Sequence, residues 1–425
     1  MSCLPAHARD TARAVMAEVL RESLPDALVY VPAVYSLLVR VLCETPLDAT
    51  SLSLTLCPLS RQGTYDGVDV CGERVLPELR RLVAAHPTLT ALSLVGYSFG
   101  GLVARYLAGC LFVDSFLGLS PLNLVTFASP HLGPILSSAR AQPLLRTLGG
   151  LSGQQMALTD ANALLLLMAH PRSAFMKGLA AFARRACYAT ASNDRTVPFW
   201  TSFISSWADG APLGPPKADG ASSASPFPHI EWQGSCAEAA ASVTGEAETS
   251  APSAEALSSS PAVDVAEVAA ETEDALRSVD IVRLALLAPL GMLILPVWLT
   301  VMPAVVTSLG IYKRHTVHRV AIPQALLLLD GDPWERVRQS EAEAMRDPQP
   351  WMAAQLNALP WLKVSVRFSL AKNGLNALHT HGLLVVRRRN LHAAGMDVLQ
   401  HLVTSTMLRA AAPLSDADED KRINE

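Results

Sequence analysis

Short apolar runs bounded by polar or turn residues recur through the first half of the chain. The clearest are ALVYVP (residues 27–32), TALSLVGY (90–97), PLNLVTFAS (121–129) and ACYATAS (186–192). Runs of this length and composition are typical of buried parallel strands. Segments with helical spacing of apolar residues, such as GLVARYLAGCLF (101–112), lie between them. Strands that alternate with helices predict βαβ units, and therefore a mostly parallel sheet flanked by helices.

The same kind of pattern resumes towards the C-terminus. ALLLLD (325–330) and WLKVSVRFSL (361–370) predict two strands, and LLVVRRR (383–389) is a candidate for a third. The segment AAGMDVLQHLVTSTMLRAA (393–411) has the spacing of an amphipathic helix that would close the fold.

Two stretches of different composition separate these regions. Residues 205–280 are dominated by Ala, Ser, Pro, Gly and acidic residues, with no Lys or Arg between Lys217 and Arg277. Such a segment has little to bury and repels itself, so we expect a disordered acidic insertion, with His229 a linker residue. Residues 284–312 then carry no charge and are long enough to span a bilayer once. Pro289, Pro296 and Pro303 each favour a kink there.

These changes in composition predict that the chain is divided into four parts. Residues 1–204 would form the first part of the core, 205–280 the insertion, 281–312 an apolar membrane hairpin or interfacial segment, and 313–425 the second part of the core.

Composition narrows the choice of partners. Half of the 425 residues are hydrophobic and 17% are charged, which suggests contact with lipid. A net charge of −4 without concentrated Lys and Arg argues against a nucleic-acid partner. The seven cysteines are scattered without metal-ligand spacing, so we expect reduced thiols in an intracellular protein and no metal or organic cofactor. The sequence identifies no protein partner.

The segment Gly96-Tyr97-Ser98-Phe99-Gly100 fits G-x-S-x-G, the nucleophile elbow of serine hydrolases. Gly96 and Gly100 would leave room for a sharp turn between strand and helix, on which Ser98 is exposed. The apolar run before Ser98 and the helical pattern after it place the motif in that context. A structural Gly-Ser-Gly turn is the alternative.

An acid and a base are expected later in the chain, in that order. Asp194 follows the predicted strand at 186–192, although an Asx turn would also explain an aspartate there. His379 and His381, between two predicted strands, are the candidates for the base. His131 precedes the acid, so we expect it at most at the rim of the site.

Four ordered blocks carry a resemblance to a known family. They are TYDGVDVCGERVLPEL (64–79), LVGYSFGGLVARY (94–106), LVTFASPHLG (124–133) and NDRTVPF (193–199). They resemble the lipase-like putative serine esterases of fungi and plants, which have an α/β-hydrolase fold. The fungal members include a lipid-droplet phospholipase and a monoacylglycerol lipase. Tyr97 stands where the family more often has a histidine, and in this position the sequence resembles the branch of the lipid-droplet phospholipase most. The resemblance implies Ser98 as nucleophile, Asp194 as acid and His381 as base, with His379 as the alternative base.

One part of the family pattern is missing. Such proteins begin with a strand that ends in a His-Gly motif, whose loop supplies one oxyanion-hole donor, and nothing of that kind precedes Ala27. The backbone N–H of Phe99 would supply one donor, and the second is not identified. Loss of one donor costs about 3 kcal/mol, on the order of 10²- to 10³-fold in rate. A catalytically impaired scaffold that binds lipid or protein is therefore one alternative, and an acyltransferase with the same triad is another.

The order of the triad also constrains the uncharged stretch. Ser98 and Asp194 precede residues 284–312 and His381 follows them, so a single crossing would separate the histidine from the serine. We therefore expect a Pro-bent hairpin or an interfacial segment. The sequence predicts a hydrolase of glycerolipid acyl esters, phospholipid or monoacylglycerol, at an endoplasmic reticulum or lipid-droplet surface.

Overall fold

The computed structural model of the 425-residue chain describes a set of separate ranges. They are residues 12–25, 27–31, 51–56, 65–133, 149–208, 210–216, 226–235, 347–369, 379–389 and 391–407, with single residues at 304, 308, 326, 373 and 377.

A seven-stranded sheet forms the centre of the fold, in the order β1-β2-β3-β4-β5-β9-β8. All neighbouring strands pair in parallel except β8, which runs antiparallel to β9 at one edge. The prediction of a mostly parallel sheet is therefore confirmed. The strands are β1 Ala27–Tyr30, β2 Ser51–Leu56, β3 Ala91–Tyr97, β4 Ser120–Phe127, β5 Arg184–Thr190, β8 Ile230–Gly234 and β9 Leu362–Val366, with a separate hairpin of β6 Trp207–Ala208 and β7 Ala211–Pro212.

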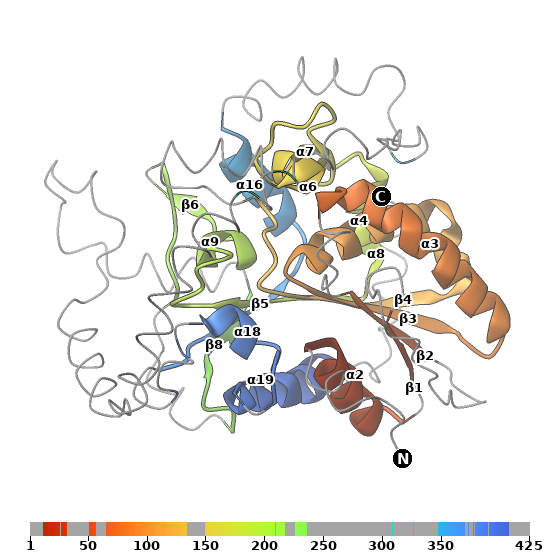
Figure 1. The fold of residues 1–425 in the computed structure, drawn as a ribbon. Helices are drawn as coiled ribbons and strands as arrows, with labels where there is room; N and C mark the ends of the chain where they lie inside the picture. Colours follow the sequence, from red (N-terminus) through yellow and green to blue (C-terminus); the bar gives the residue numbers. More distant parts are fainter. Residues whose placement is uncertain are drawn as a thin grey trace, which may run out of the picture.

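Helices cover both faces of this sheet (Figure 1). The helices α3, α4 and α8 lie on one face, and α2 and α19 lie on the other. The bounds are α2 Ala12–Ser23, α3 Val68–Ala85, α4 Phe99–Val113, α6 Gly150–Met156, α7 Leu164–Leu167, α8 Ala174–Ala181, α9 Phe199–Ser202, α16 Pro348–Asn357, α18 Thr380–Leu383 and α19 Met396–His401. Short 3₁₀ segments span η3 Ser115–Gly118 and η8 Ala393–Gly395, and a π-helical turn spans η9 Leu402–Met407.

Two hydrophobic cores follow from the alternation of side chains along the strands. Leu92 and Leu94 of β3 join the core under α3 and α4, whereas Val95 and Tyr97 join the core under α2 and α19. Successive side chains of a strand point to opposite faces, so an apolar run with both faces covered buries nearly every residue. Burial on both faces fixes the register of β3, and with it the position of Ser98 at its end.

The insertion predicted at 205–280 is partly an ordered piece of the fold. Within it, β8 pairs with β9 and extends the sheet by one strand. His229, expected in a linker, lies against this edge, with its Nδ1 2.7 Å from an Asp397 carboxylate oxygen. The acidic composition predicted disorder over the whole stretch, but Ile230 is buried in the core under α2 and α19, and Trp232 is buried in a small separate cluster with Ala189 and Phe203. The rest of the insertion lies largely outside the described residues.

Two further expectations have different outcomes. The strand candidate at 383–389 is wrong, because Leu383 ends α18 and turns follow it. The apolar stretch 284–312 and the predicted strand 325–330 lie outside the described residues, apart from single positions. In the ranges that are described, no helix combines the length and the apolar character needed to cross a bilayer.

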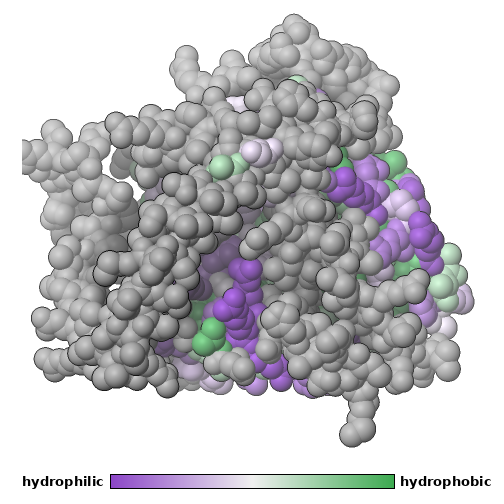
Figure 2. Space-filling model, in the orientation of Figure 1, coloured by the Kyte–Doolittle hydropathy of each residue, from purple (hydrophilic) through white to green (hydrophobic). Residues whose placement is uncertain are grey.

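The surface over α3 is polar. In the orientation of Figure 1, hydrophilic residues gather over the outward side of this helix, as Figure 2 shows. The helix turns Val68, Val75 and Leu79 to the core and charged residues to solvent, as expected of an amphipathic helix on one face of a sheet.

Candidate active site

Ser98 lies on a strained turn between β3 and α4. Its backbone has φ 54° and ψ −128°, a conformation that non-glycine residues adopt rarely and at a cost of order 1–3 kcal/mol. The Ser98 N–H donates to the Phe127 carbonyl at 2.7 Å, and the Gly101 N–H donates to the Ser98 carbonyl at 3.0 Å. The strand, strained serine and helix therefore have the geometry of a nucleophile elbow.

Close contacts, with backbone atoms at Gly96 and with a side chain at Gly101, explain two glycines of this turn. A Cβ on Gly96 would lie 2.5 Å from the Gly101 Cα and 2.7 Å from the Gly100 carbonyl oxygen. A Cβ on Gly101 would lie 1.9 Å from Ser129 Oγ. The G-x-S-x-G pattern selected Gly96 and Gly100, whereas Gly101 was not selected, because its constraint comes from the loop after β4.

Asp194 lies in the loop after β5 and uses both carboxylate oxygens. Its Oδ1 accepts hydrogen bonds from the N–H groups of Thr196 and Val197, at 2.8 and 2.9 Å. Its Oδ2 lies 2.8 Å from Nδ1 of His381 and 3.4 Å from the Thr190 hydroxyl. The Asx turn and the contact with a histidine, which the sequence offered as alternatives for Asp194, are both present in this geometry. The Asx-turn contacts orient the oxygen that faces the histidine.

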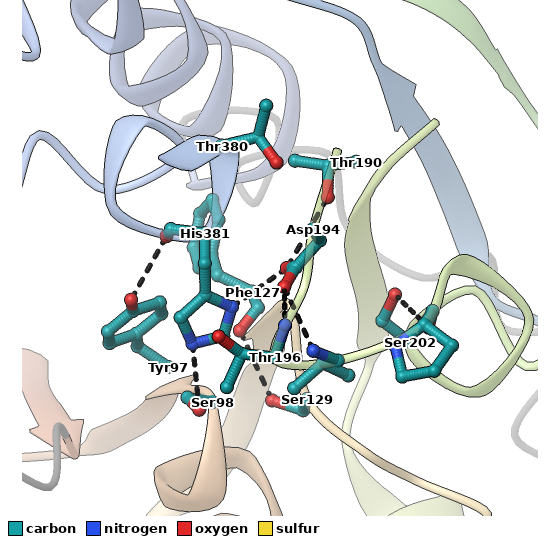
Figure 3. A network of polar contacts seen from close by, with 12 residues as sticks. Tyr97, Ser98, Phe127, Ser129, Thr190, Asp194, Thr196, Ser202, Thr380 and His381 are labelled. Carbon is teal, nitrogen blue, oxygen red and sulfur yellow. Dashed lines mark hydrogen bonds and ion pairs between the residues drawn. The ribbon is translucent and has the colours of Figure 1, made fainter. Parts of the chain in front are cut away.

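His381 joins the serine to the aspartate (Figure 3). Its Nε2 lies 3.0 Å from Ser98 Oγ, and its Nδ1 lies on the Asp194 side. With Asp194 as acceptor, Nδ1 carries the proton and Nε2 accepts from the serine hydroxyl. The His381 side chain is 14% exposed and that of Asp194 is 2% exposed, so their hydrogen bond faces little water.

Sheet topology brings these distant residues together. Strands β3, β4 and β5 are adjacent and parallel, so the carboxyl ends that carry Ser98 and Asp194 meet at one edge of the sheet. Two contacts then hold α18 over that edge. The Thr380 hydroxyl donates to the Ser192 carbonyl at 3.1 Å, and the Tyr97 hydroxyl donates to the His381 carbonyl at 3.0 Å.

Tyr97 also supports the imidazole directly. The two ring centroids lie 4.9 Å apart, tilted by 38°. Because the tyrosine ring is buried under α18, it restricts the rotation of the histidine ring. The sequence pattern marked Tyr97 only as the variable position of the elbow motif.

The remaining histidines have other positions. His379 is the exposed N-cap residue of α18, and it lies on a pocket beside the site rather than against Ser98. His131, expected at the rim, is instead fully buried, with Nε2 2.9 Å from the Thr126 hydroxyl. Burial, with smaller effects of Arg105 and Lys363, lowers the pKa of His131 well below its ordinary value of 6.5.

Phe99 is the first residue of α4, so no carbonyl one turn earlier in the helix accepts its N–H. This donor lies next to the serine, at the positive end of the helix dipole, as stabilisation of an oxyanion requires. The loops that leave β1 and β2 lie outside the described residues, and the second donor remains unassigned. Within the described residues, no three His, Cys, Asp or Glu side chains are grouped to hold a metal ion.

Comparison with known proteins finds one matching family. Residues 50–206 match the model of the family described as "Putative serine esterase (DUF676)". The matched segment contains Ser98 and Asp194, whereas His381 lies beyond it.

Three fungal proteins are similar over about a quarter of the chain. The "Putative lipase C4A8.10" of Schizosaccharomyces pombe is 32% identical over 131 residues, which are 28% of this chain and 17% of the relative. For Saccharomyces cerevisiae, the "Putative lipase YDL109C" is 33% identical over 123 residues, 27% of this chain and 18% of the relative. The "Putative lipase ROG1" of the same yeast is 30% identical over 127 residues, which cover 28% of this chain and 18% of the relative.

The chain thus spans under a fifth of the length of these curated relatives. No solved structure matches. Over residues 50–206 this chain is therefore similar to the putative serine esterase family.

Proposed function

We propose that the chain is a serine hydrolase that cleaves acyl esters of glycerolipids. The observation that carries the proposal is the continuous contact from Ser98 Oγ through the His381 imidazole to the Asp194 carboxylate, at 3.0 and 2.8 Å. The strained elbow and the buried acid support it. The three fungal relatives are each named "Putative lipase", and these names support a lipid ester as the substrate.

The residues would act in two half-reactions. His381 Nε2 takes the proton of Ser98 as Oγ attacks the ester carbonyl, and the Phe99 N–H stabilises the oxyanion. His381 then gives the proton to the leaving alcohol oxygen, and an acyl-serine remains. A water molecule, deprotonated by the same nitrogen, attacks the acyl-serine and releases the fatty acid. Asp194 keeps the imidazole oriented and stabilises its charged form throughout.

Hydrolysis of a glycerolipid by the purified full chain tests this proposal. We expect release of fatty acid, and a fall of at least about 10⁴-fold for Ser98→Ala. Addition of an alcohol acceptor separates hydrolysis from acyl transfer, because a transferase would form the new ester in preference to free fatty acid. Fatty-acid release by the Ser98→Ala variant at the wild-type rate would contradict the proposal.

We further propose that the enzyme acts at a lipid-droplet or endoplasmic reticulum surface. This location is supported by the uncharged stretch 284–312 and by the basic segment KRHTVHR (313–319) that follows it. Epitope tags before residue 284 and after residue 312 should share one protease-accessible side of the membrane. Tags on opposite sides would contradict the triad as well, because His381 could then not reach Ser98.

A further inference from the structure

A pocket of ≈ 360 Å³ lies beside the candidate triad and is strongly basic. His381 itself lines it, together with Thr196 from the loop that carries Asp194. Arg195 and the pair Arg387 and Arg388 also line it. None of the described residues that line it is acidic. Positive charge is thus concentrated on one side of the site, in a chain whose net charge is −4.

These arginines differ from their neighbour Arg389. The Arg389 guanidinium pairs with the Glu18 carboxylate at 2.7 Å and does not line the pocket. In the part of the chain that the structure describes, no carboxylate pairs with the guanidinium groups of Arg195, Arg387 or Arg388. The side chains of Arg195, Arg387 and Arg388 are all exposed. Among the described residues, nothing therefore neutralises these charges before an anion can bind.

The local positive potential acts on a neighbouring histidine. His392 also lines the pocket, and its Nδ1 accepts the Arg388 backbone N–H at 3.3 Å. Burial, and after it the charges of Arg388 and Arg387, lower the pKa of His392. A neutral His392 therefore adds no charge, and the anion-binding capacity belongs to the arginines.

The mechanism determines which end of a substrate would enter this pocket. His381 must deliver its proton to the leaving alcohol oxygen, so the leaving group lies on the histidine side of the acyl carbon. In a glycerolipid the leaving group is the glycerol with its headgroup. The phosphate of a glycerophospholipid is attached to that glycerol, a few bonds from the cleaved ester.

We propose that Arg195, Arg387 and Arg388 bind the phosphate of a glycerophospholipid whose acyl ester is cleaved at Ser98. Guanidinium groups suit this ligand, because their planar donors match phosphate oxygens in bidentate geometry. The assignment rests on the proposed function and deepens it. It favours phospholipid over monoacylglycerol, which offers these arginines no anion.

The test compares two substrates that differ only in the phosphate. Oleoyl lysophosphatidic acid and monooleoylglycerol carry the same acyl chain on the same glycerol, and both are supplied in micelles of a nonionic detergent. The ratio of their kcat/KM values measures the preference for phosphate. We expect wild type to prefer the phosphorylated lipid, and Arg387→Gln/Arg388→Gln to lower that ratio by about tenfold or more, mainly through KM.

Arg389→Gln is the matched control, since it removes an adjacent arginine charge outside the pocket. We expect it to leave the ratio within about twofold of wild type, because an exposed pair contributes little. If the double variant and the control lower the ratio equally, the effect is general electrostatics and the proposal is wrong. An unchanged ratio in the double variant also overturns it.

Binding to an inactive chain separates this inference from the proposed function. The full chain with Ser98→Ala should bind a short-chain phosphatidic acid more tightly than the matching diacylglycerol, and the arginine substitutions should remove the difference. Equal affinity for the two lipids contradicts the inference, whether or not wild type is active. Binding of inorganic phosphate to the arginines without any effect on the substrate ratio would show a free-phosphate site and would also overturn it. Fatty-acid release with no phosphate preference contradicts the inference alone, whereas absence of any Ser98-dependent hydrolysis contradicts the proposed function.

Discussion

Substitution of Gly96 by alanine tests whether close contact at the elbow positions Ser98. The added Cβ would lie 2.5 Å from the Gly101 Cα, and 2.7 Å from both the Gly101 nitrogen and the Gly100 oxygen. Ordinary contact between such atoms needs about 3.5–4.0 Å, so the start of α4 would have to move by roughly 1 Å. All three neighbours are backbone atoms, and no side-chain rotation can relieve the clash.

The displacement has two consequences. Overpacking of this kind destabilises a fold by about 1–3 kcal/mol. Since Ser98 is the residue before α4, the same shift changes its 3.0 Å contact with His381. A misplacement of about 1 Å in a catalytic group can cost on the order of 10²-fold in rate. We therefore expect a larger relative loss of activity than of stability.

The assay combines chemical denaturation of the full chain with the rate of fatty-acid release by the folded protein. Gly214→Ala is the control, because among the described residues a Cβ there meets no atom within 4 Å and its φ is not in the left-handed region. We expect the control to match wild type in both measurements. If Gly96→Ala unfolds at the wild-type denaturant concentration and retains the wild-type rate, the elbow does not depend on this contact.

Two further predictions concern residues that contact the His381 imidazole, and a third concerns the buried His131. Asp194→Asn should lower kcat by about 10⁴-fold with little change in stability, because the amide oxygen can still accept the loop N–H bonds but the side chain no longer stabilises the imidazolium. Steady-state kinetics and denaturation curves test this, and an equal fall in kcat and in stability would show a purely structural role. Tyr97→Phe removes the hydroxyl bond to the His381 carbonyl but keeps the ring, so kcat should fall several-fold at unchanged KM; an equal rise in KM would contradict a positioning role. Folding lowers the pKa of His131 below the ordinary histidine value of 6.5, so at lower pH the unfolded chain binds more protons than the folded chain. The free energy of unfolding should therefore fall as the pH drops below about 6.5. Denaturation at about pH 7 and about pH 5 should show a smaller loss for His131→Asn than for wild type, and equal losses would mean that other groups cause the acid sensitivity.

The elbow and its flanking elements could be predicted because their signals are local. An apolar run, glycines around a serine and a helical pattern follow one another directly between residues 91 and 113, and the structure has β3, Ser98 and α4 in that order. The loop position of Asp194 after β5 could be predicted for the same reason. The sequence also left His379 and His381 open, and only the orientation of α18 places His381 against the serine.

The features that sequence did not predict depend on contacts between distant segments. Strand β8 lies in a sequence region rich in acidic and small residues, yet burial of Ile230 in the core under α2 and α19 and of Trp232 in a small separate cluster gives it a place at the sheet edge. The β-branched run Val385–Val386 resembles a strand locally, but packing of α18 on the active-site edge turns it into a buried turn. Local composition carries no information about such packing.

Labelling with a fluorophosphonate probe tests the central claim most directly, since the probe reacts only with an activated serine. In the full-length chain, mass spectrometry of the labelled protein should locate the adduct on Ser98. Labelling should be lost in His381→Ala and retained in His379→Ala, because Nε2 of His381 lies 3.0 Å from the serine oxygen. An unlabelled wild-type chain, or labelling of Ser98 that survives His381→Ala, would contradict the proposed triad.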